Sequence, residues 1–201
     1  MPKYKSVNNE LVTSEYREKG SKFIGYIKVV KSSNEALDFV RTLKEEHPQA
    51  VHVCFAYKIG IGNNETHRYS DDGEPSNSAG APIFGQIKSF DLTNIVIAVV
   101  RYYGGVNLGV GGLINAYRTA AKEVVDQAKV VTKEQTFQYK LDFEYSDMAL
   151  LMDDVKKEKI NICEQHFESD CYLIVDVNEG EIDFLKQLEV KYQTLKLNKL
   201  G

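Results

Sequence analysis

Residues 95–113 read IVIAVVRYYGGVNLGVGGL, and this stretch decides the fold of the first part of the chain. Residues 95–100 form an apolar run rich in β-branched side chains, which is typical of a strand that is buried on both faces. Five glycines follow within the nine positions 104–112. A helix is expected next, because apolar residues recur there on one face of a helical repeat. These residues are Leu113, Tyr117, Ala120, Ala121 and Val124.

The segments before this stretch alternate between strand and helix patterns. Residues 23–30 have the composition of a strand, and residues 32–35 read S-x-x-E, the capping box that starts a helix. Residues 51–59 alternate at period two and predict another strand. A polar, turn-rich stretch at 67–75 then precedes a predicted helix at 79–89.

The last third of the chain has a more regular pattern. It predicts, in order, a strand, a helix, two strands, a helix and a strand. The predicted bounds are 137–145, 147–157, 160–167, 171–177, 181–190 and 194–200. The order β-α-β-β-α-β is that of a ferredoxin-like fold, in which helices cover one face of an antiparallel sheet.

The charge balance changes near residue 132. Residues 1–132 contain 16 Lys+Arg and 14 Asp+Glu, whereas residues 133–201 contain 9 and 15, so the net charges are +2 and −6. Such an asymmetry fits two domains of which only the first faces a polyanion. We therefore expect two domains, residues 1–132 and residues 133–201.

The composition excludes several classes of protein. With 43% hydrophobic residues and a net charge of −4, the chain is not disordered. No apolar run approaches the roughly 18 residues that cross a bilayer, and the first residues lack the apolar segment of a signal peptide. Three scattered cysteines, Cys54, Cys163 and Cys171, argue against a disulfide scaffold or a zinc site. We expect a cytoplasmic protein without a membrane partner, a metal or a cofactor.

The glycine-rich loop could bind an anion. Gly104, Gly105, Gly109, Gly111 and Gly112 lead directly into a helix start, where unpaired amides and the helix dipole favour negative charge. The spacing matches neither the Walker loop nor G-x-G-x-x-G. In the alternative interpretation, the glycines only let the loop pack closely against the neighbouring strand.

Three carboxylates lie within four positions: Asp71, Asp72 and Glu74. They could hold a hard cation or act as acid and base groups. The spacing does not match the EF-hand loop and no HExxH signature accompanies it, however, and D-G-E-P is also a good turn. In the alternative interpretation the carboxylates pair with Arg68 or Arg101, or cap the next helix. Cys54 and His52 lie on one face of a predicted strand and allow a weaker Cys-His hypothesis.

Basic and aromatic residues lie close to the glycine loop in the sequence. Guanidinium groups bind phosphate and tyrosine rings stack on bases, so this combination suits RNA. Arg101 also leaves the end of a buried strand, where open α/β sheets usually place ligands. Each tyrosine taken singly is more typical of core or rim packing. The candidate residues are Arg68, Arg101, Tyr102, Tyr103, Arg118 and Lys122.

These residues also carry a family resemblance: the span from about residue 21 to 131 resembles the IMPACT/YigZ family. The matching segments are 70–75, 78–80, 100–105, 108–109, 111–113 and 116–117. Residues 137–201 resemble the smaller C-terminal domain of the bacterial branch. Two places depart from the family's pattern: Asn107 stands where Lys is common, and 76–80 reads SNSAG in place of SGTAG. The first change removes a cation from the proposed phosphate site.

The resemblance implies an α+β protein with a ribosomal-protein-S5-domain-2-like first domain and a ferredoxin-like second domain. The same two architectures occur side by side in the last two domains of the translocation elongation factor, which contact the ribosome. Eukaryotic relatives regulate translation by competing for the activator of a starvation-responsive initiation-factor kinase. They carry a different additional domain, so that partner cannot be transferred to this sequence.

Three functional hypotheses follow. The first is a non-catalytic, translation-associated regulatory module whose first domain binds the ribosome or structured RNA, without reading DNA sequence. Its groove would combine residues 71–75, Arg101 and the glycine loop. The second is an enzyme for a small phosphorylated or acyl substrate, which requires at least one of the three carboxylates to be buried without a salt-bridge partner. The third is a protein-protein interaction module with tyrosine anchors, which could include a translation-related protein as partner. An exposed apolar patch away from the glycine loop would favour it.

Overall fold

The first part of the chain is built on a five-stranded sheet in the order β2-β3-β6-β4-β5. The computed structural model describes residues 3–8, 10–168 and 170–200. All four strand pairs of this sheet are antiparallel. The strands are β2 (Val12–Glu18), β3 (Ser21–Val29), β6 (Ile95–Tyr102), β4 (His52–Ile59) and β5 (Thr66–Ser70).

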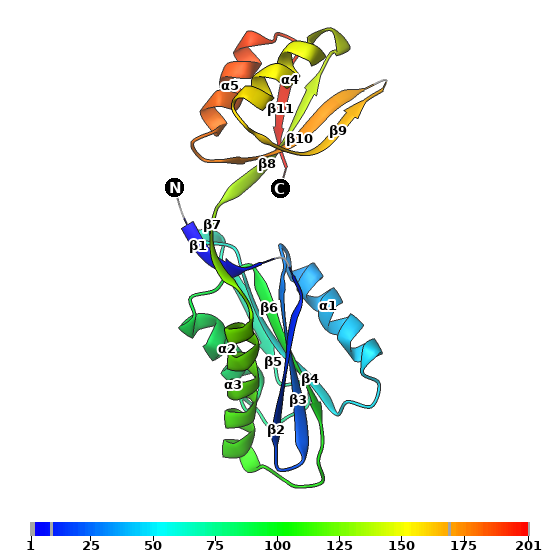
Figure 1. The fold of residues 1–201 in the computed structure, drawn as a ribbon, viewed down its shortest axis with the longest axis vertical. Coiled ribbons are helices and arrows are strands. Elements are labelled where there is room, and N and C mark those ends of the chain that lie inside the picture. Colours follow the sequence, from blue (N-terminus) through cyan, green and yellow to red (C-terminus); the bar gives the residue numbers. More distant parts are fainter. Residues whose placement is uncertain (1–2, 9, 169, 201) are drawn as a thin grey trace. The chain divides into compact units, whose positions relative to one another are not determined.

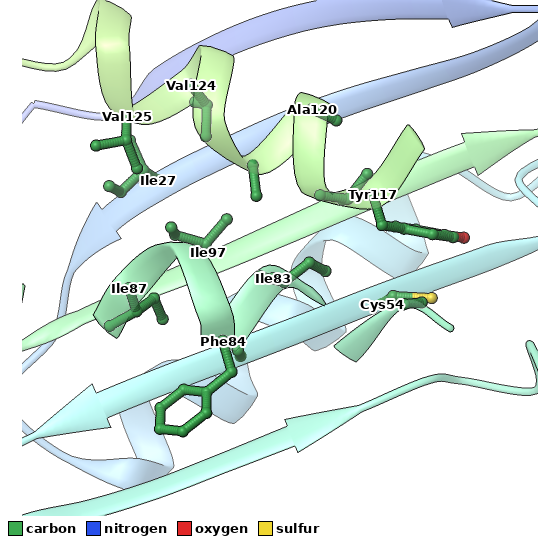
Figure 2. Packing of buried hydrophobic residues seen from close by; sticks show 14 of the residues in the cluster. Ile27, Cys54, Ile83, Phe84, Ile87, Ile97, Tyr117, Ala120, Val124 and Val125 are labelled. Carbon is green, nitrogen blue, oxygen red and sulfur yellow. The ribbon is translucent and has the colours of Figure 1, made fainter. Parts of the chain in front are cut away.

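Helices cover both faces of this sheet (Figure 1). On one face lie α2 (Gly80–Ser89) and α3 (Gly109–Gln127), and on the other lies α1 (Ser33–Glu46). The central strand β6 therefore supplies Ile97 to the first layer and Val96 to the second, and both are fully buried. Figure 2 shows Ile97 facing the apolar side chains of α2 and α3. The predicted strand with two buried faces is confirmed.

The start of α1 follows the predicted capping box. The Ser32 hydroxyl accepts the amide of Glu35 at 3.2 Å, and the Glu35 carboxylate accepts the amide of Lys31 at 2.9 Å. These two bonds satisfy amides that the helix itself leaves unpaired. The helix ends at Glu46, and its C-cap, His47, lies directly before Pro48.

Four strands are absent from the sequence-based expectations. The first, β1 (Lys3–Val7), pairs with the second, β7 (Val130–Glu134), in a separate two-stranded sheet, and β2 and β5 are the edges of the large sheet. Strand β5 overlaps the stretch at 67–75 expected to be turn-rich, and it follows the 3-10 turn η1 (Gly62–Asn64). Its residues are almost all exposed, so it lacks the alternating apolar pattern that indicates a strand.

The second part of the chain has the predicted β-α-β-β-α-β order. Its four strands form an antiparallel sheet in the order β11-β8-β10-β9, which is the ferredoxin-like arrangement. Leu141, Leu173 and Val175 of the sheet share a core with Leu151 and Leu185 of the helices. The elements are β8 (Thr136–Phe143), η2 (Tyr145–Asp147), α4 (Met148–Lys157), β9 (Asn161–Phe167), β10 (Cys171–Asn178), α5 (Ile182–Lys191) and β11 (Lys196–Lys199).

The described residues thus form two units, each with its own hydrophobic core. The first unit spans Tyr4–Lys133, and the second combines the residues from Glu134 onward with Lys3. This boundary lies one residue after the one expected from the charge balance. The expected α+β class is confirmed. Among the described residues, no helix is both long enough and apolar enough to span a bilayer.

Candidate functional site

Three segments meet at the end of the large sheet where β6 finishes. The start of β4 pairs with β6 so that His52 lies opposite Arg101. The loop at 71–75 follows β5 and lies against this pair, since the Asp72 carbonyl oxygen is 2.7 Å from His52 Nδ1. The glycine loop leaves β6 at the same end and leads into α3. The acids, the guanidinium and the glycines therefore gather at one end of the first unit.

A buried polar network ties these segments together. Glu74 Oε1 accepts hydrogen bonds from Arg101 Nη1 at 2.5 Å and from the Tyr117 hydroxyl at 2.7 Å. The Glu74 and Arg101 side chains are only 4% and 8% exposed. The Arg101 guanidinium also lies over the ring of Phe23, 5.5 Å from its centroid. This network joins the 71–75 loop, β6 and α3, and its three members are 27 and 43 positions apart in the sequence.

The other two carboxylates also have partners. Asp71 Oδ1 accepts the amides of Ala79 and Gly80 at 2.9 and 2.8 Å, and so caps the start of α2. Asp72 Oδ2 accepts the amide of Val53 at 2.8 Å, while Oδ1 pairs with Lys44. The alternative interpretation, in which the carboxylates pair with an arginine or cap a helix, describes Asp71 and Glu74.

The enzyme hypothesis required a buried carboxylate without a partner, and none of the three meets this condition. Among the described residues, no group of three or more His, Cys, Asp or Glu side chains is arranged to hold a metal ion. The three carboxylates of the 71–75 loop instead attach this loop to α2, β4 and β6.

The Cys-His hypothesis does not fit the environment of Cys54. Its Sγ donates to the carbonyl oxygen of Asp71 at 3.0 Å, and the residue is fully buried. Burial raises the pKa of the Cys54 thiol far above its ordinary value, and the nearby carboxylates raise it further. The neighbouring Tyr117 hydroxyl also has a strongly raised pKa, mainly because of burial. Cys54 is thus held as a thiol, which is a weak nucleophile.

Within the glycine loop, close packing explains Gly104 and restricts Gly112, where a Cβ atom would lie 3.0 Å from Leu108 Cβ. A Cβ atom at Gly104 would lie 1.9 Å from the carbonyl carbon of Gly20, in the turn between β2 and β3. The Gly104 amide donates to the Ser21 hydroxyl at 3.1 Å. Gly105 and Gly109 have positive φ angles of 84° and 70°, which side chains rarely adopt.

Gly111 has neither constraint, because a Cβ there would meet nothing within 4 Å and its φ is not positive. The residue before α3, Leu108, makes no side-chain capping hydrogen bond, so it leaves the first amides of the helix without a cap. Arg118 and Lys122 lie seven and eleven positions after Gly111 and are exposed on the same side of α3. We call residues 103–112 together with Arg118 and Lys122 the α3 surface.

Sequence reasoning missed one cation next to this surface. Lys19 lies in the exposed turn between β2 and β3, directly before Gly20, which contacts Gly104. Figure 1 shows this turn beside the loop that enters α3. The only sequence signal for the contact between Gly20 and Gly104 is that both residues are glycines. This signal can be used only when the pairing of β3 with β6 is known.

Three of the predicted residues do not belong to the α3 surface. Arg101 is buried and held by Glu74, so it offers little surface to a phosphate. Tyr102 lies on the opposite face of the sheet, where its hydroxyl is 2.7 Å from His47 Nδ1. Arg68 lies opposite Tyr57 in the β4–β5 pair, on the α1 side of the sheet. The expected ligand site at the end of β6 assumed a parallel sheet, and this sheet is antiparallel.

Exposed apolar side chains also occur in the glycine loop. Tyr103, Val106 and Val110 are 48%, 50% and 52% exposed. Because these residues lie within the loop, they do not form the separate apolar patch that would favour the protein-recognition hypothesis. The same loop thus presents backbone amides, one aromatic ring and two small apolar side chains.

Residues 19–125 match the family model of the Impact N-terminal domain, which covers more than half of the chain. The chain belongs to the IMPACT family. An IMPACT family member of Haemophilus influenzae is 33% identical over 178 residues, or 88% of this chain and 86% of the relative. The Protein IMPACT homolog of Saccharomyces cerevisiae is 29% identical over 111 residues, or 54% of this chain and 43% of that protein. A crystal structure of a hypothetical protein covers 100% of this chain and 98% of its own chain, at 27% identity and a TM-score of 0.74.

The family assignment confirms the resemblance drawn from the sequence. The matched span includes the buried network of Glu74, Arg101 and Tyr117, together with the α3 surface. The IMPACT motifs around residues 70–75 and 100–113 therefore serve two purposes in this structure. One part holds the loop, the strand and the helix together, and the other forms an exposed surface at the start of α3.

Proposed function

We propose that this IMPACT family protein is a non-catalytic, translation-associated regulatory module that binds the ribosome or structured RNA through the α3 surface. The proposal retains the glycine loop from the sequence-based groove, together with the candidate residues Arg118 and Lys122. It leaves out Arg101, because its guanidinium is already engaged by a buried carboxylate.

The observation that carries the proposal is the open, uncapped start of α3. The first four amides of a helix have no partner within the helix and favour an anion. Here the residue before the helix makes no side-chain capping hydrogen bond, and the first turn contains Gly109, Gly111 and Gly112. A phosphate could approach the backbone at Gly111 without meeting a side chain, since the space around this glycine is open.

The charges around this helix start support a polyanion as the ligand. Lys19, Arg118 and Lys122 are exposed, and their positive charges add to that of the helix dipole. Arg118 is 3.3 Å from the side chain of Asn115, and Lys122 pairs with Asp126 on the helix surface. Such exposed contacts are weak, so both cations remain available to a phosphate. Lys19 stands close to the loop in which Asn107 replaces the common lysine.

Family membership supports the link to translation. The resemblance described above implies that eukaryotic members of the family regulate translation, and the Protein IMPACT homolog of yeast matches 111 residues of this chain. The partners of those proteins are not transferred. The ribosome is favoured here because a structured RNA surface presents closely spaced phosphates to an exposed cationic helix.

Two matched pairs of variants test the proposal in a binding assay with purified ribosomes over a series of salt concentrations. Gly111→Asp places a carboxylate among the α3 amides, whereas Gly111→Ala changes only the volume. We expect Gly111→Asp to abolish binding and Gly111→Ala to retain it. Arg118→Ala should lower the slope of log affinity against log salt by about one contact. Lys186→Ala, an exposed helix cation of the second unit, should leave the slope unchanged.

Equal binding of Gly111→Asp and Gly111→Ala would exclude the α3 amides as the anion site. Affinity that does not depend on salt would exclude a phosphate ligand altogether. If Arg118→Ala and Lys186→Ala reduce the slope equally, the contact is a general charge effect and not a defined surface.

A further inference from the structure

A second exposed surface lies at the edge of the large sheet, on β5 and α2. The imidazole ring of His67 stacks on the ring of Phe84, with centroids 4.6 Å apart and planes inclined by 12°. The ring of Tyr69 stacks on the same phenyl ring at 5.8 Å and 23°. Lys88 Nζ lies 5.1 Å from the Phe84 centroid. We call these four residues the β5 aromatic cluster.

The backbone fixes the two outer rings in this arrangement. His67 and Tyr69 are two positions apart in β5, so both point to the α2 side of the sheet. The β4–β5 register confirms this, because Tyr69 lies opposite Ala56, a member of the core under α2 and α3. Phe84 is nearly buried and extends from α2 at the margin of this core (Figure 2). The outer rings are therefore held in place before any ligand binds.

The cluster combines exposed rings with positive charge. His67 is exposed, and Tyr69 is 41% exposed. Lys88 is exposed beside them, and Arg68 lies on the same strand between the two rings, on its other face. Among the described residues, neither Lys88 nor Arg68 forms an ion pair with a carboxylate. Glu65, three positions before Arg68, pairs with Lys58.

Protection of a sheet edge explains only part of this surface. A short edge strand with a charged residue such as Arg68 prevents pairing with other strands. It does not require an exposed tyrosine and an exposed imidazole that both stack on the same phenyl ring. Flat rings flanked by cations match an unpaired nucleobase and its phosphate, because each base has a face that stacks and each nucleotide carries one negative charge.

We propose that the β5 aromatic cluster is a stacking site for an unpaired base of single-stranded RNA. A base would stack on Tyr69 and His67, while Lys88 and Arg68 would neutralise the adjoining phosphates. The inference rests on the proposed function in so far as both assign an RNA ligand. It concerns a different surface and an unpaired segment, whereas the α3 surface is assigned to phosphates of structured RNA.

The test uses the full chain and a fluorescently labelled single-stranded oligoadenylate of 12 nucleotides. Tyr69→Leu keeps an apolar side chain on Phe84 but removes the ring, and it should weaken binding about tenfold. Tyr69→Phe keeps the ring and should bind as the unmodified protein does. Tyr145→Leu removes another exposed tyrosine, from the second unit, and should have no effect. Urea unfolding midpoints show whether each variant is folded.

Measuring the affinity over a series of salt concentrations separates a lost stacking contact from a lost charge, which unfolding of the variant would not do. Tyr69→Leu should lower the affinity while leaving the salt slope unchanged, whereas Lys88→Ala should reduce the slope by about one contact. Unchanged binding by a folded Tyr69→Leu variant overturns the inference, as does a failure of the unmodified protein to bind the oligonucleotide. Equal weakening by Tyr69→Leu and Tyr69→Phe would show a hydroxyl contact and would also overturn it. If Tyr69→Leu weakens binding to ribosomes but not to the oligonucleotide, the surface contacts protein.

The two proposals fail separately. Salt-dependent ribosome binding that is lost in Gly111→Asp, without any oligonucleotide binding, would leave the proposed function and remove the stacking site. Oligonucleotide binding that depends on Tyr69, without ribosome binding, would do the reverse.

Discussion

Glu74 has a role that its neighbours in the sequence do not reveal. Its carboxylate is almost fully buried and joins Arg101 to Tyr117, so it balances a guanidinium that would otherwise be buried alone. A buried ion pair adds little net stability compared with apolar residues, but the loss of one partner is costly. Removal of either Glu74 or Arg101 should therefore cost more stability than the intact pair contributes.

Replacement of Glu74 by Gln should therefore destabilise the first unit by about 3 kcal/mol, because a charged Arg101 would stay buried without a carboxylate. The matched control is Asp126→Asn, which removes an exposed partner of Lys122 and should cost at most about 0.5 kcal/mol. Urea unfolding measures both. Equal effects of the two variants would show that the buried pair is not special.

Burial of Cys54 predicts a dependence of stability on alkaline pH. Folding raises the pKa of the Cys54 thiol, so above roughly pH 8.5 the unfolded chain loses this proton and the folded chain keeps it. The folded state then binds more protons, and the free energy of unfolding falls as pH rises. Cys54 should contribute a decrease of up to about 1.4 kcal/mol per pH unit between about pH 9.5 and 10.5.

Urea unfolding across this pH range, for the unmodified protein and for Cys54→Ala, isolates the contribution of this thiol. Other groups titrate in both proteins, so the difference between the two pH curves belongs to Cys54. Parallel curves would contradict the prediction.

At the scale of elements, the glycines before and within the first turns of α3 differ in what requires them, and Gly104 and Gly111 are the two extremes. Gly104 is needed because the turn between β2 and β3 lies directly against it, and Gly111 has open space around it. Gly104 thus serves packing. Gly111 is left unexplained by packing or by backbone conformation, and it is the one on which the proposed anion site depends.

Two alanine variants separate these extremes. Gly104→Ala forces the backbone of the neighbouring turn to move and should destabilise the protein by roughly 2 kcal/mol or more. Gly111→Ala fills open space in a helix and should raise the free energy of unfolding by about 0.5 kcal/mol. Thermal or urea unfolding measures the two changes, which should have opposite signs. A stability loss in Gly111→Ala would contradict the open geometry.

The start of α1 gives a further prediction at this scale. Ser32→Ala removes the hydroxyl that accepts the Glu35 amide and should cost about 1 kcal/mol. Ser33→Ala, one position later and inside the helix, should change the stability by only a few tenths of a kcal/mol. If urea unfolding shows equal losses for both serines, the capping bond does not stabilise the helix.

The sequence predicts elements well where burial follows a simple period. Residues 95–100 and the stripe from Leu113 to Val124 are such cases, and so is the second unit. Prediction from the sequence fails for β5, because its exposed residues show no apolar pattern, and it also fails for the edge strand β2. In the site, it anticipated that Glu74 could pair with Arg101, but it also assigned Arg101 to a phosphate. Only the strand register shows that Arg101 points into the core while Tyr102 points to α1.

At the scale of the molecule, the two units have separate hydrophobic cores. The clusters of the first unit contain residues up to Ala128, and that of the second begins at Leu141. Among the described residues, no side chain belongs to the clusters of both units, so we expect each core to lose its packing without the other. The two units, which differ in net charge, should therefore be open to separate destabilisation by mutation.

Hydrogen exchange can test this independence. Leu173→Ala removes a fully buried side chain from β10 and should destabilise the second unit by about 3 kcal/mol. Amides after residue 134 should lose protection, while amides of residues 10–133 should keep it. Ile174→Ala, at the neighbouring position on the other face of β10, should have a smaller effect. Loss of protection in β6 or α3 would show that the units unfold together.

The end of β6 also has a consequence for how the large sheet selects one alignment of its strands. Residues 95–100 are apolar on both faces, so a shift of one residue would exchange similar side chains and cost little hydrophobic contact. The same shift would turn Arg101 toward His47 and Tyr102 toward Glu74, leaving a buried guanidinium without its carboxylate. Arg101 and Tyr102 at the end of β6 thus make a shifted register unfavourable. The long apolar run alone does not distinguish the native register from a shifted one.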